Sequence, residues 1–288
     1  MEKIEQTTYH IFQTDSKIVN QVYHEQDNYL IEYDKKGDKE WCAIYFCSND
    51  IYYPNTEEVF YNRIIKKNFF EWYHSRVNKA YKHIFIRDIF KQWYLAGINK
   101  TINTPNKLIE FIKKETKDYK VITIGSSAGG YAAILYGSFI NAYYSLVFNP
   151  QFELKSLLQK SSEKINPLLF RIKDERIKYL DITNFINKET KIFYFYSNHS
   201  PWDIEQYNFI KSTNKVIPIP FNSKHHGIPF LKVALPIVIN LNVDDLEHLS
   251  NKRHNPIIFT IKMVGCIKTC IGLYKQLLTA YKKRNRIF

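Results

Sequence analysis

Residues 119–131 read YKVITIGSSAGGY, and this stretch decides the fold of the 288-residue chain. Its first half, Tyr119 to Ile124, is a continuous β-branched run of the kind that forms a strand buried on both faces of a parallel sheet. Its second half is rich in small residues and predicts a helix from Ala128 to Tyr136. The segment between them predicts a tight turn that carries Ser127 at its centre.

The turn residues fit the pattern G-x-S-x-G, in which a serine on a sharp strand-to-helix turn acts as a nucleophile. Small neighbours are needed there because Cβ atoms at the flanking positions would clash. The alternatives are a turn whose glycines serve only packing and a loop that cradles a phosphate. The two common nucleotide-binding patterns, G-x-x-x-x-G-K-[ST] and G-x-G-x-x-G, do not match the residues here.

A nucleophilic serine needs a base, and the base needs an acid that orients it. In the chain order that accompanies this turn, the acid and then the histidine follow later, each in a loop after a strand. Asp203 follows the predicted strand Lys191 to Tyr196 and is the expected acid. Glu205 is the alternative acid, less favourably placed because it lies one turn into a predicted helix.

The expected base lies after the predicted strand Lys215 to Ile219. We prefer His226 because the following Gly227 lets the loop turn the imidazole back toward the serine. His225 is the alternative base. His199 is a further histidine of the same edge and is expected to line the pocket.

Two backbone N–H groups are expected to hold the oxyanion that forms when a serine attacks an acyl carbon. The first belongs to Ala128, directly after the serine. The second is expected just after the early strand Trp41 to Cys47, at Cys47 or Ser48.

Other polar side chains at the carboxyl ends of strands are candidates for contact with the substrate, because sites of α/β proteins lie at that edge. Arg87 and Asp88 end the predicted strand His83 to Arg87, and Ser126 precedes the nucleophile. For Arg87 and Asp88, a structural ion pair is an equally good interpretation.

Along the whole chain, strands and helices alternate after a strand-rich start, which predicts an α/β fold with a mostly parallel central sheet flanked by helices. The start has predicted strands at Thr8 to Thr14 and Asn28 to Tyr33, which we expect to form a hairpin. A charged, periodic segment over about 152–187 predicts a helical insertion over one edge of the sheet. Residues 1–255 are expected to form one domain, followed by a basic amphipathic helical tail at 256–288.

Composition narrows the classes of function. Lys and Arg number 41 against 28 Asp and Glu, a formal net charge of +13, which favours anionic partners. No nucleic-acid-binding motif accompanies this charge, so we expect no nucleic acid partner. The four cysteines have no metal-site spacing, so we expect no metal and reduced, mostly buried thiols.

The ends of the chain bear on its location. The first residues, Met1 to Gln6, have no apolar core of a secretion signal, so we expect a cytoplasmic protein. The tail ends in Lys282-Lys283-Arg284-Asn285-Arg286, and a helix docked on the domain is expected. Contact with the anionic inner face of a membrane, or self-association, is the alternative.

Four stretches together resemble the α/β-hydrolase-type proteins of bacterial capsule and lipooligosaccharide loci, and within them the serine-dependent sialate O-acetyltransferases. They are residues 125–131, Phe85 to Asp88 with Trp93-Tyr94, Asn149-Pro150 and His225 to Gly227. The resemblance implies an α/β-hydrolase fold and transfer of an acetyl group from acetyl-CoA, through acyl-Ser127, to a hydroxyl of a surface sugar such as sialic acid. It implies no permanently bound cofactor.

Two other functions fit the same residues. An O-acetyl esterase or carboxylesterase would use the same three side chains with water as the acceptor. A non-catalytic α/β-hydrolase-like component of a glycan assembly or export complex would keep the fold but hold the serine out of reach of both histidines.

Overall fold

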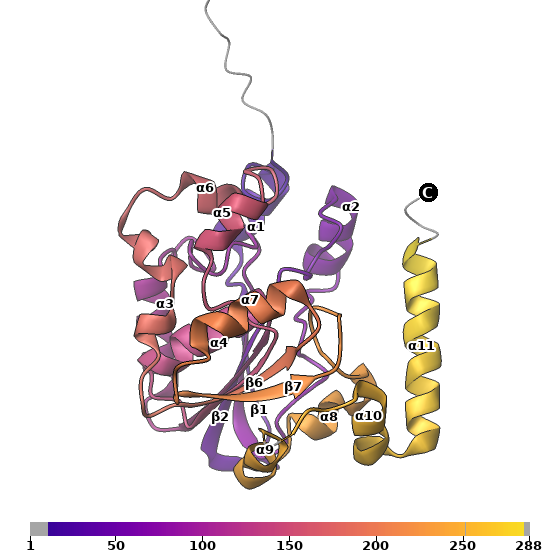
Figure 1. Cartoon of the computed structure of the whole chain (residues 1–288). Coiled ribbons are helices and arrows are strands. Elements are labelled where there is room, and N and C mark those ends of the chain that lie inside the picture. The colour runs from indigo at the N-terminus through magenta and orange to yellow at the C-terminus, as the bar shows by residue number, and fades with distance from the viewer. Residues whose placement is uncertain (1–10, 251, 285–288) are drawn as a thin grey trace, which may run out of the picture.

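The computed structural model describes residues 11–250 and 252–284 (Figure 1). Their strands form one seven-stranded sheet in the order β1-β3-β2-β4-β5-β6-β7. Every neighbouring pair is parallel except β1 and β3. The strands are β1 (Tyr29–Tyr33), β2 (Asp38–Phe46), β3 (Ala80–Ile86), β4 (Lys120–Ser126), β5 (Tyr144–Phe148), β6 (Lys191–Ser197) and β7 (Val216–Phe221). The α/β-hydrolase fold expected from the sequence is confirmed.

Helices cover both faces of this sheet. The α-helices are α1 (Lys17–Glu25), α2 (Glu57–Phe60), α3 (Pro105–Thr116), α4 (Ala128–Phe139), α5 (Lys155–Lys160), α6 (Pro167–Arg171), α7 (Pro201–Ile210), α8 (Leu235–Val238), α9 (Val243–Ser250), α10 (Pro256–Val264) and α11 (Cys266–Arg284). Shorter turns of other helix types are η1 (Tyr61–Ile65), η2 (Glu175–Leu180), η3 (Thr183–Phe185) and η4 (Lys232–Ala234).

Alternating side chains of the strands pack into two separate hydrophobic cores, one on each face of the sheet. In β2, Cys42, Ile44 and Phe46 pack with α3, α4 and the 152–187 segment, whereas Ala43 and Tyr45 pack with α1, α2, α8 and α9 on the opposite face. The period of two along a strand produces this division. The central strands are therefore apolar on both faces, as their sequences predicted.

The N-terminal part differs from the prediction. Residues 11–14 form a turn rather than the end of a strand, and the rest of the predicted strand Thr8 to Thr14 lies outside the described residues. Residues 11–14, the part of that segment that the structure describes, form no hairpin with β1. Instead β1 pairs antiparallel with β3, through Tyr29 opposite Ile86 and Tyr33 opposite Lys82. A strand can pair with a segment far along the chain instead of with the nearest one, and the local sequence does not show which pairing forms.

The predicted insertion consists of short helices, α5, α6, η2 and η3, joined by loops. It lies over one face of the sheet rather than over an edge, because Leu157, Leu169 and Tyr179 enter the same core as α4. The predicted helical tail is α10 followed by α11. Among the described residues, no helix has the length and apolar character needed to cross a membrane.

Candidate active site

Ser127 lies between β4 and α4, and its backbone has φ 51° and ψ −121°. A positive φ is unusual for a residue with a side chain, and it concentrates at functional sites. The close packing of the turn explains its glycines. A Cβ on Gly125 would lie 2.0 Å from the Gly129 carbonyl oxygen, and one on Gly129 would lie 2.3 Å from the Phe46 carbonyl oxygen. The turn therefore holds Ser127 at the carboxyl edge of the sheet at the cost of local strain.

The structure joins Ser127 to His226 and Asp203 by hydrogen bonds. The Ser127 Oγ is 3.0 Å from His226 Nε2, and His226 Nδ1 is 2.7 Å from Asp203 Oδ1. Asp203 is buried, with 1% of its side chain exposed, whereas 27% of the His226 side chain is exposed. Ser127 lies in the turn after β4, Asp203 in the helix after β6 and His226 in the loop after β7. These strands are parallel, so the three side chains reach one edge of the sheet.

Asp203 lies in the first turn of α7 and not in a loop. Ser200 is the N-cap of this helix, and its hydroxyl accepts a hydrogen bond from the Asp203 backbone N–H. A carboxylate in the first turn is favoured by the helix dipole. The second carboxylate oxygen, Asp203 Oδ2, is buried without a hydrogen-bond partner among the described residues. The helix thus fixes the acid with one oxygen aimed at His226.

Gln151 fixes the direction of the Ser127 proton. Its Oε1 accepts a hydrogen bond of 2.9 Å from Trp93 Nε1, and an indole nitrogen can only donate. Its Nε2 must therefore be the atom that faces Ser127, where it donates to Oγ over 3.3 Å. Since Oγ accepts from Gln151, its own hydrogen is left to point to His226 Nε2. The imidazole then carries its proton on Nδ1, the nitrogen that faces Asp203.

Asn149 holds the loop that carries His226. Its Nδ2 donates to the carbonyl oxygens of His225 at 3.3 Å and Gly227 at 2.6 Å, on either side of the histidine. Its Oδ1 accepts from the backbone N–H of Ser197, and the Ser197 hydroxyl donates to the His225 carbonyl at 2.6 Å. These hydrogen bonds connect the ends of β5 and β6 to the loop after β7 that carries His226.

Trp202 covers the imidazole from one side. Its ring stacks on His226 with centroids 4.7 Å apart and planes 11° apart. Trp202 also lines a cavity of about 510 Å³. The other walls come from the 152–187 segment and α7, and are Leu157, Lys160, Ser161, Ile165, Asn166, Pro201 and Glu205. A cavity of this size, mainly apolar with a few polar groups, lies within the range of small-molecule sites.

The expected oxyanion donors are only partly available. No acceptor for the Ala128 N–H is found within the described residues, as suits the first N–H of a helix. The Cys47 N–H donates to the Ile86 carbonyl at 3.0 Å, which extends the β2–β3 ladder. The Ser48 N–H donates to Glu71 Oε2 at 2.6 Å, and the Ser48 hydroxyl donates to the other Glu71 oxygen. Both N–H groups expected as the second donor, those of Cys47 and Ser48, therefore already have acceptors in this structure.

Glu71 is an unusual neighbour for an oxyanion site. Burial raises the pKa of its carboxyl above the ordinary value, while the two bonds from Ser48 lower it. Its own backbone N–H is directed at Cys47 Sγ. The Ser48 N–H is open to another acceptor only if the Glu71 carboxylate leaves it.

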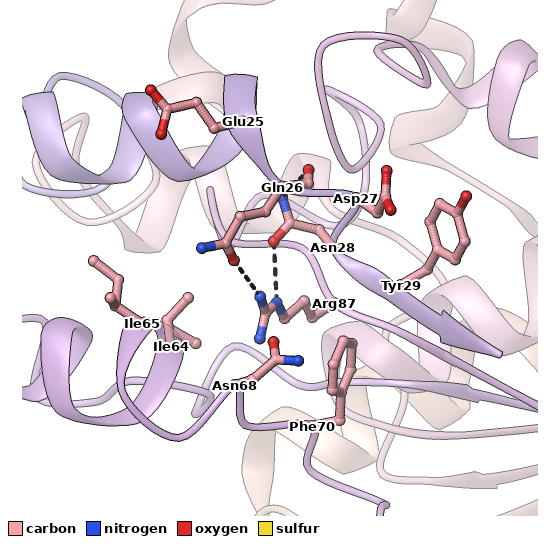
Figure 2. Close-up of a pocket in the computed structure, with 10 residues that line it drawn as sticks. All are labelled: Glu25, Gln26, Asp27, Asn28, Tyr29, Ile64, Ile65, Asn68, Phe70 and Arg87. Carbon is pink, nitrogen blue, oxygen red and sulfur yellow. Dashed lines mark hydrogen bonds between the residues drawn. The ribbon is translucent and has the colours of Figure 1, made fainter. Parts of the chain in front are cut away.

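Arg87 lies apart from Ser127, because β2 separates its strand from β4. Its guanidinium donates to Asn28 Oδ1 at 3.0 Å, Gln26 Oε1 at 2.9 Å and the Phe69 carbonyl at 3.2 Å. Arg87 lines a separate cavity of about 360 Å³ between the α1–β1 connection and η1. Figure 2 shows its hydrogen bonds to Gln26 and Asn28. Burial lowers the pKa of this guanidinium to about 10. The predicted ion pair with Asp88 is absent from these contacts.

Asp88 is a structural carboxylate. Its oxygens accept four backbone N–H groups, from Phe90, Lys91, Gln92 and Tyr94, at 2.7 to 3.1 Å. The bonds close a loop in which Lys91, Trp93 and Tyr94 all have positive φ. The structure thus gives Asp88 a full set of backbone partners and does not bring it to Ser127.

The remaining predicted residues lie around the site without joining the bonded chain. Glu205 forms an ion pair with Lys160, and no ion pair of Glu205 with His226 is found among the described residues. The bonds to Ser127 and Asp203 are made by His226 and not by His225. Burial, followed by the charges of His226 and Lys232, lowers the pKa of His225. His199 is exposed in the loop before α7, and Ser126 is buried as the last residue of β4. Cys42 and Cys47 are buried free thiols, whereas Cys266 and Cys270 are exposed.

Within the described ranges, no group of three or more His, Cys, Asp or Glu side chains has the arrangement of a metal site. Sequence reasoning did not name Gln151, Trp202 or Glu71 as site residues. It quoted Asn149 only within the stretch Asn149-Pro150 of the resemblance and gave it no role. Trp202 was the easiest to find, because it is adjacent to Asp203 at the start of a helix. Gln151 and Glu71 act through contacts with residues distant in the chain and belong to none of the motifs.

No protein-family model matches the chain, and no protein with a curated function matches its sequence. Solved structures with a similar course of the chain include a protein of unknown function from Staphylococcus aureus Mu50, at 13% identity over 77% of this chain and 94% of the other, with a TM-score of 0.44. The capsule O-acetyltransferase of Neisseria meningitidis serogroup A is similar at 17% identity over 68% and 85%, with a TM-score of 0.43. The fluorophosphonate-binding serine hydrolase FphF of S. aureus is similar at 10% identity over 67% and 89%, with a TM-score of 0.40. Identities and scores this low do not transfer an activity.

Proposed function

We propose that the protein is a serine acyltransferase that moves an acetyl group from acetyl-CoA to a hydroxyl of a bacterial surface sugar, sialic acid being the expected acceptor. The observation that carries the proposal is the hydrogen-bonded series Ser127, His226 and Asp203 on a strained turn. A serine held in this way by a base and a buried acid is the arrangement of acyl-transfer enzymes on several unrelated folds.

In the first half of the reaction, Ser127 takes the acetyl group. Its Oγ forms a bond to the thioester carbonyl carbon while its proton passes to His226 Nε2. The carbonyl oxygen becomes negative and accepts a hydrogen bond from the Ala128 N–H. When the carbonyl re-forms, the carbon–sulfur bond breaks, and the CoA thiolate takes the proton from His226.

In the second half, the sugar hydroxyl takes the acetyl group. Its oxygen attacks the carbonyl carbon of acyl-Ser127 while its proton passes to His226 Nε2. The bond from carbon to Ser127 Oγ then breaks, and Oγ recovers the proton. In both halves the buried Asp203 carboxylate stabilises the imidazolium and keeps its Nδ1 proton in place.

The two substrates are anionic, which the charge of the chain supports. CoA carries phosphates and sialylated glycans carry carboxylates, so a chain with a net charge of +13 attracts both. The use of acetyl-CoA implies a cytoplasmic location. An acceptor presented at the inner face of the membrane would be reached most readily by an enzyme bound at that surface.

We place the acceptor in the cavity beside Trp202. This cavity shares a wall with the imidazole, through the stacked Trp202 ring. Its polar groups, Ser161, Asn166 and the Lys160–Glu205 pair, suit sugar hydroxyls. A bulky Ile165→Trp substitution is expected to raise the KM for the acceptor and to leave the KM for acetyl-CoA unchanged.

The test is release of CoA thiol from acetyl-CoA, with and without a sialylated oligosaccharide. Wild type, Ser127→Ala and Ser138→Ala are compared. Ser138 is a matched control because it lies on α4, its hydroxyl has no partner among the described residues, and it is remote from His226. We expect release to depend on the acceptor and on Ser127, and to survive in Ser138→Ala.

Two results would contradict the transferase. Cleavage of simple acetyl esters that depends on Ser127, without any thiol release, would make the protein an esterase. Silence in both assays with a folded protein would favour a non-catalytic component of a glycan complex.

A further inference from the structure

Helix α11 presents an apolar stripe that the rest of the described chain leaves uncovered. Figure 1 shows α11 at the margin of the molecule, next to α10 and with no other element on its outer side. The stripe consists of Ile267, Ile271, Tyr274, Leu278 and Tyr281, of which Leu278 is the least exposed at 38% and Ile267 the most at 78%. Their spacing of four, three, four and three residues places them on one line along the helix.

The opposite side of α11 is the side that docks on the domain. Thr269 is buried there, and a Cβ on Gly272 would lie 2.7 Å from Val233. Gln276 Oε1 accepts a hydrogen bond of 2.9 Å from the Lys232 N–H at the start of η4. The helix is therefore held to the body by one face, which turns the stripe outward.

The charges of α11 are all of one sign. Its 19 residues include Lys268, Lys275, Lys282, Lys283 and Arg284 and contain no Asp or Glu. The first three recur every seven residues, about two turns, so their positions follow one line beside the stripe. An apolar face with interfacial tyrosines and a bordering row of lysines is the composition of helices that lie on anionic membranes.

The same features argue against a second copy of the chain as the occupant. The stripe extends over only about two heptads, fewer than the three or four that a coiled coil usually needs. Pairing of two α11 helices would also bring cations together, with no carboxylate on either helix to compensate them.

We infer that α11 binds the surface of a membrane rich in anionic lipid, with the stripe in the headgroup region and the lysines toward lipid phosphates. The helix docks beside η4, which directly follows the loop that carries His226. Binding through α11 therefore attaches the chain to the surface through the helix that docks on this segment. The inference is independent of the proposed reaction, because lipid binding is measured without substrate.

The test is co-sedimentation of the full-length protein with two kinds of vesicle. One is phosphatidylcholine alone, and the other is an equal mixture of phosphatidylcholine and phosphatidylglycerol. We expect the wild type to bind the mixed vesicles at least about 10-fold more tightly than the neutral ones, since each lysine near an anionic surface contributes about 1 kcal/mol.

Three variants sharpen the test. Ile271→Glu/Leu278→Glu removes the stripe, and Lys268→Glu/Lys275→Glu reverses two of the cations. Each is expected to weaken binding to mixed vesicles by about 10-fold or more. Ile177→Glu is the matched control, because it makes the same change at an exposed isoleucine of η2, and it should bind like the wild type.

Circular dichroism and thermal unfolding establish that each variant is folded. Equal vesicle binding by the wild type and both α11 variants would overturn the inference, as would an absence of binding to mixed vesicles. A dimer in solution that becomes monomeric in Ile271→Glu/Leu278→Glu, with vesicle binding unchanged, would assign the stripe to a second copy instead.

Discussion

Two buried carboxylates lie at the carboxyl edge of the same sheet and have opposite surroundings. Asp88 follows β3 and accepts four backbone N–H groups, two on each oxygen. Asp203 follows β6, and one of its oxygens is hydrogen-bonded to the His226 ring nitrogen Nδ1. Its second oxygen has no partner among the described residues. Asp203, the carboxylate with an unpaired oxygen, is the one that faces a titratable side chain.

The difference teaches how to separate structural from functional acids at such an edge. A carboxylate saturated by N–H groups of its own loop has no capacity left for another group, and its loss is felt as instability. A buried carboxylate with unused acceptor capacity is costly to fold, and beside a titratable side chain it is a candidate for a role in chemistry. Both residues followed a strand in the sequence, and only the contacts distinguish them.

The comparison is tested most strongly by Asp203→Asn. The amide oxygen can still accept from the imidazole, but the negative charge that stabilises the imidazolium is lost. We expect kcat for acetyl transfer to fall by roughly 10⁴-fold. The free energy of unfolding should change by about 1 kcal/mol or less, because the hydrogen bond remains. Steady-state kinetics and urea unfolding measure the two effects, and an activity loss explained by unfolding would remove the distinction from Asp88.

Asp88→Asn should give the opposite pattern. The amide nitrogen cannot accept, so two of the four backbone N–H groups lose their partner. We expect the free energy of unfolding to fall by about 2–4 kcal/mol. At a temperature where the variant is folded, kcat should stay within about 3-fold of the wild-type value, because Asp88 does not contact the reacting groups. A loss of kcat as large as that of Asp203→Asn would show that Asp88 acts in the reaction.

The pH dependence of stability gives a third test. Burial raises the pKa of Asp88 from 3.8 to about 6, against the effect of its four N–H partners. The folded state therefore holds the Asp88 proton more tightly than the unfolded state. This contribution to stability is present below about pH 4 and is lost as the pH rises through about 6, by up to about 3 kcal/mol.

Urea unfolding of the wild type and Asp88→Asn across this pH window isolates that contribution from those of other carboxyl groups. The advantage of the wild type should shrink as the pH rises. An advantage that stays constant or grows would mean that Asp88 does not have a raised pKa.

Glu205→Gln should have the smallest effect. Glu205 pairs with Lys160 at the rim of the Trp202 cavity, where solvent screens the pair. We expect a change in unfolding free energy below about 1 kcal/mol and a kcat within about 2-fold of the wild type, with at most a few-fold change in the KM for the acceptor. A collapse of kcat would identify Glu205, and not Asp203, as the acid that orients His226.

The sequence identified the parts of the site that local patterns encode. The apolar run of β4, the glycines around Ser127 and the small residues of α4 predict the turn, and chain order then points to Asp203 and His226. It could not show that the Glu71 carboxylate takes the Ser48 N–H, because that contact joins segments separated by 23 positions. The sequence could not show the role of Gln151 either, because the orientation of its side chain depends on Trp93 from another loop. Such contacts depend on tertiary packing, which no short motif records.

Labelling with a fluorophosphonate probe, followed by peptide mass spectrometry, tests the central claim most directly, because it reports whether Ser127 is a nucleophile without assuming a donor or acceptor. We predict labelling at Ser127 in the wild type, none in Ser127→Ala, and strongly slowed labelling in His226→Ala and Asp203→Asn. A folded wild-type protein that stays unlabelled at Ser127, or labelling that proceeds equally fast without His226, would contradict the account.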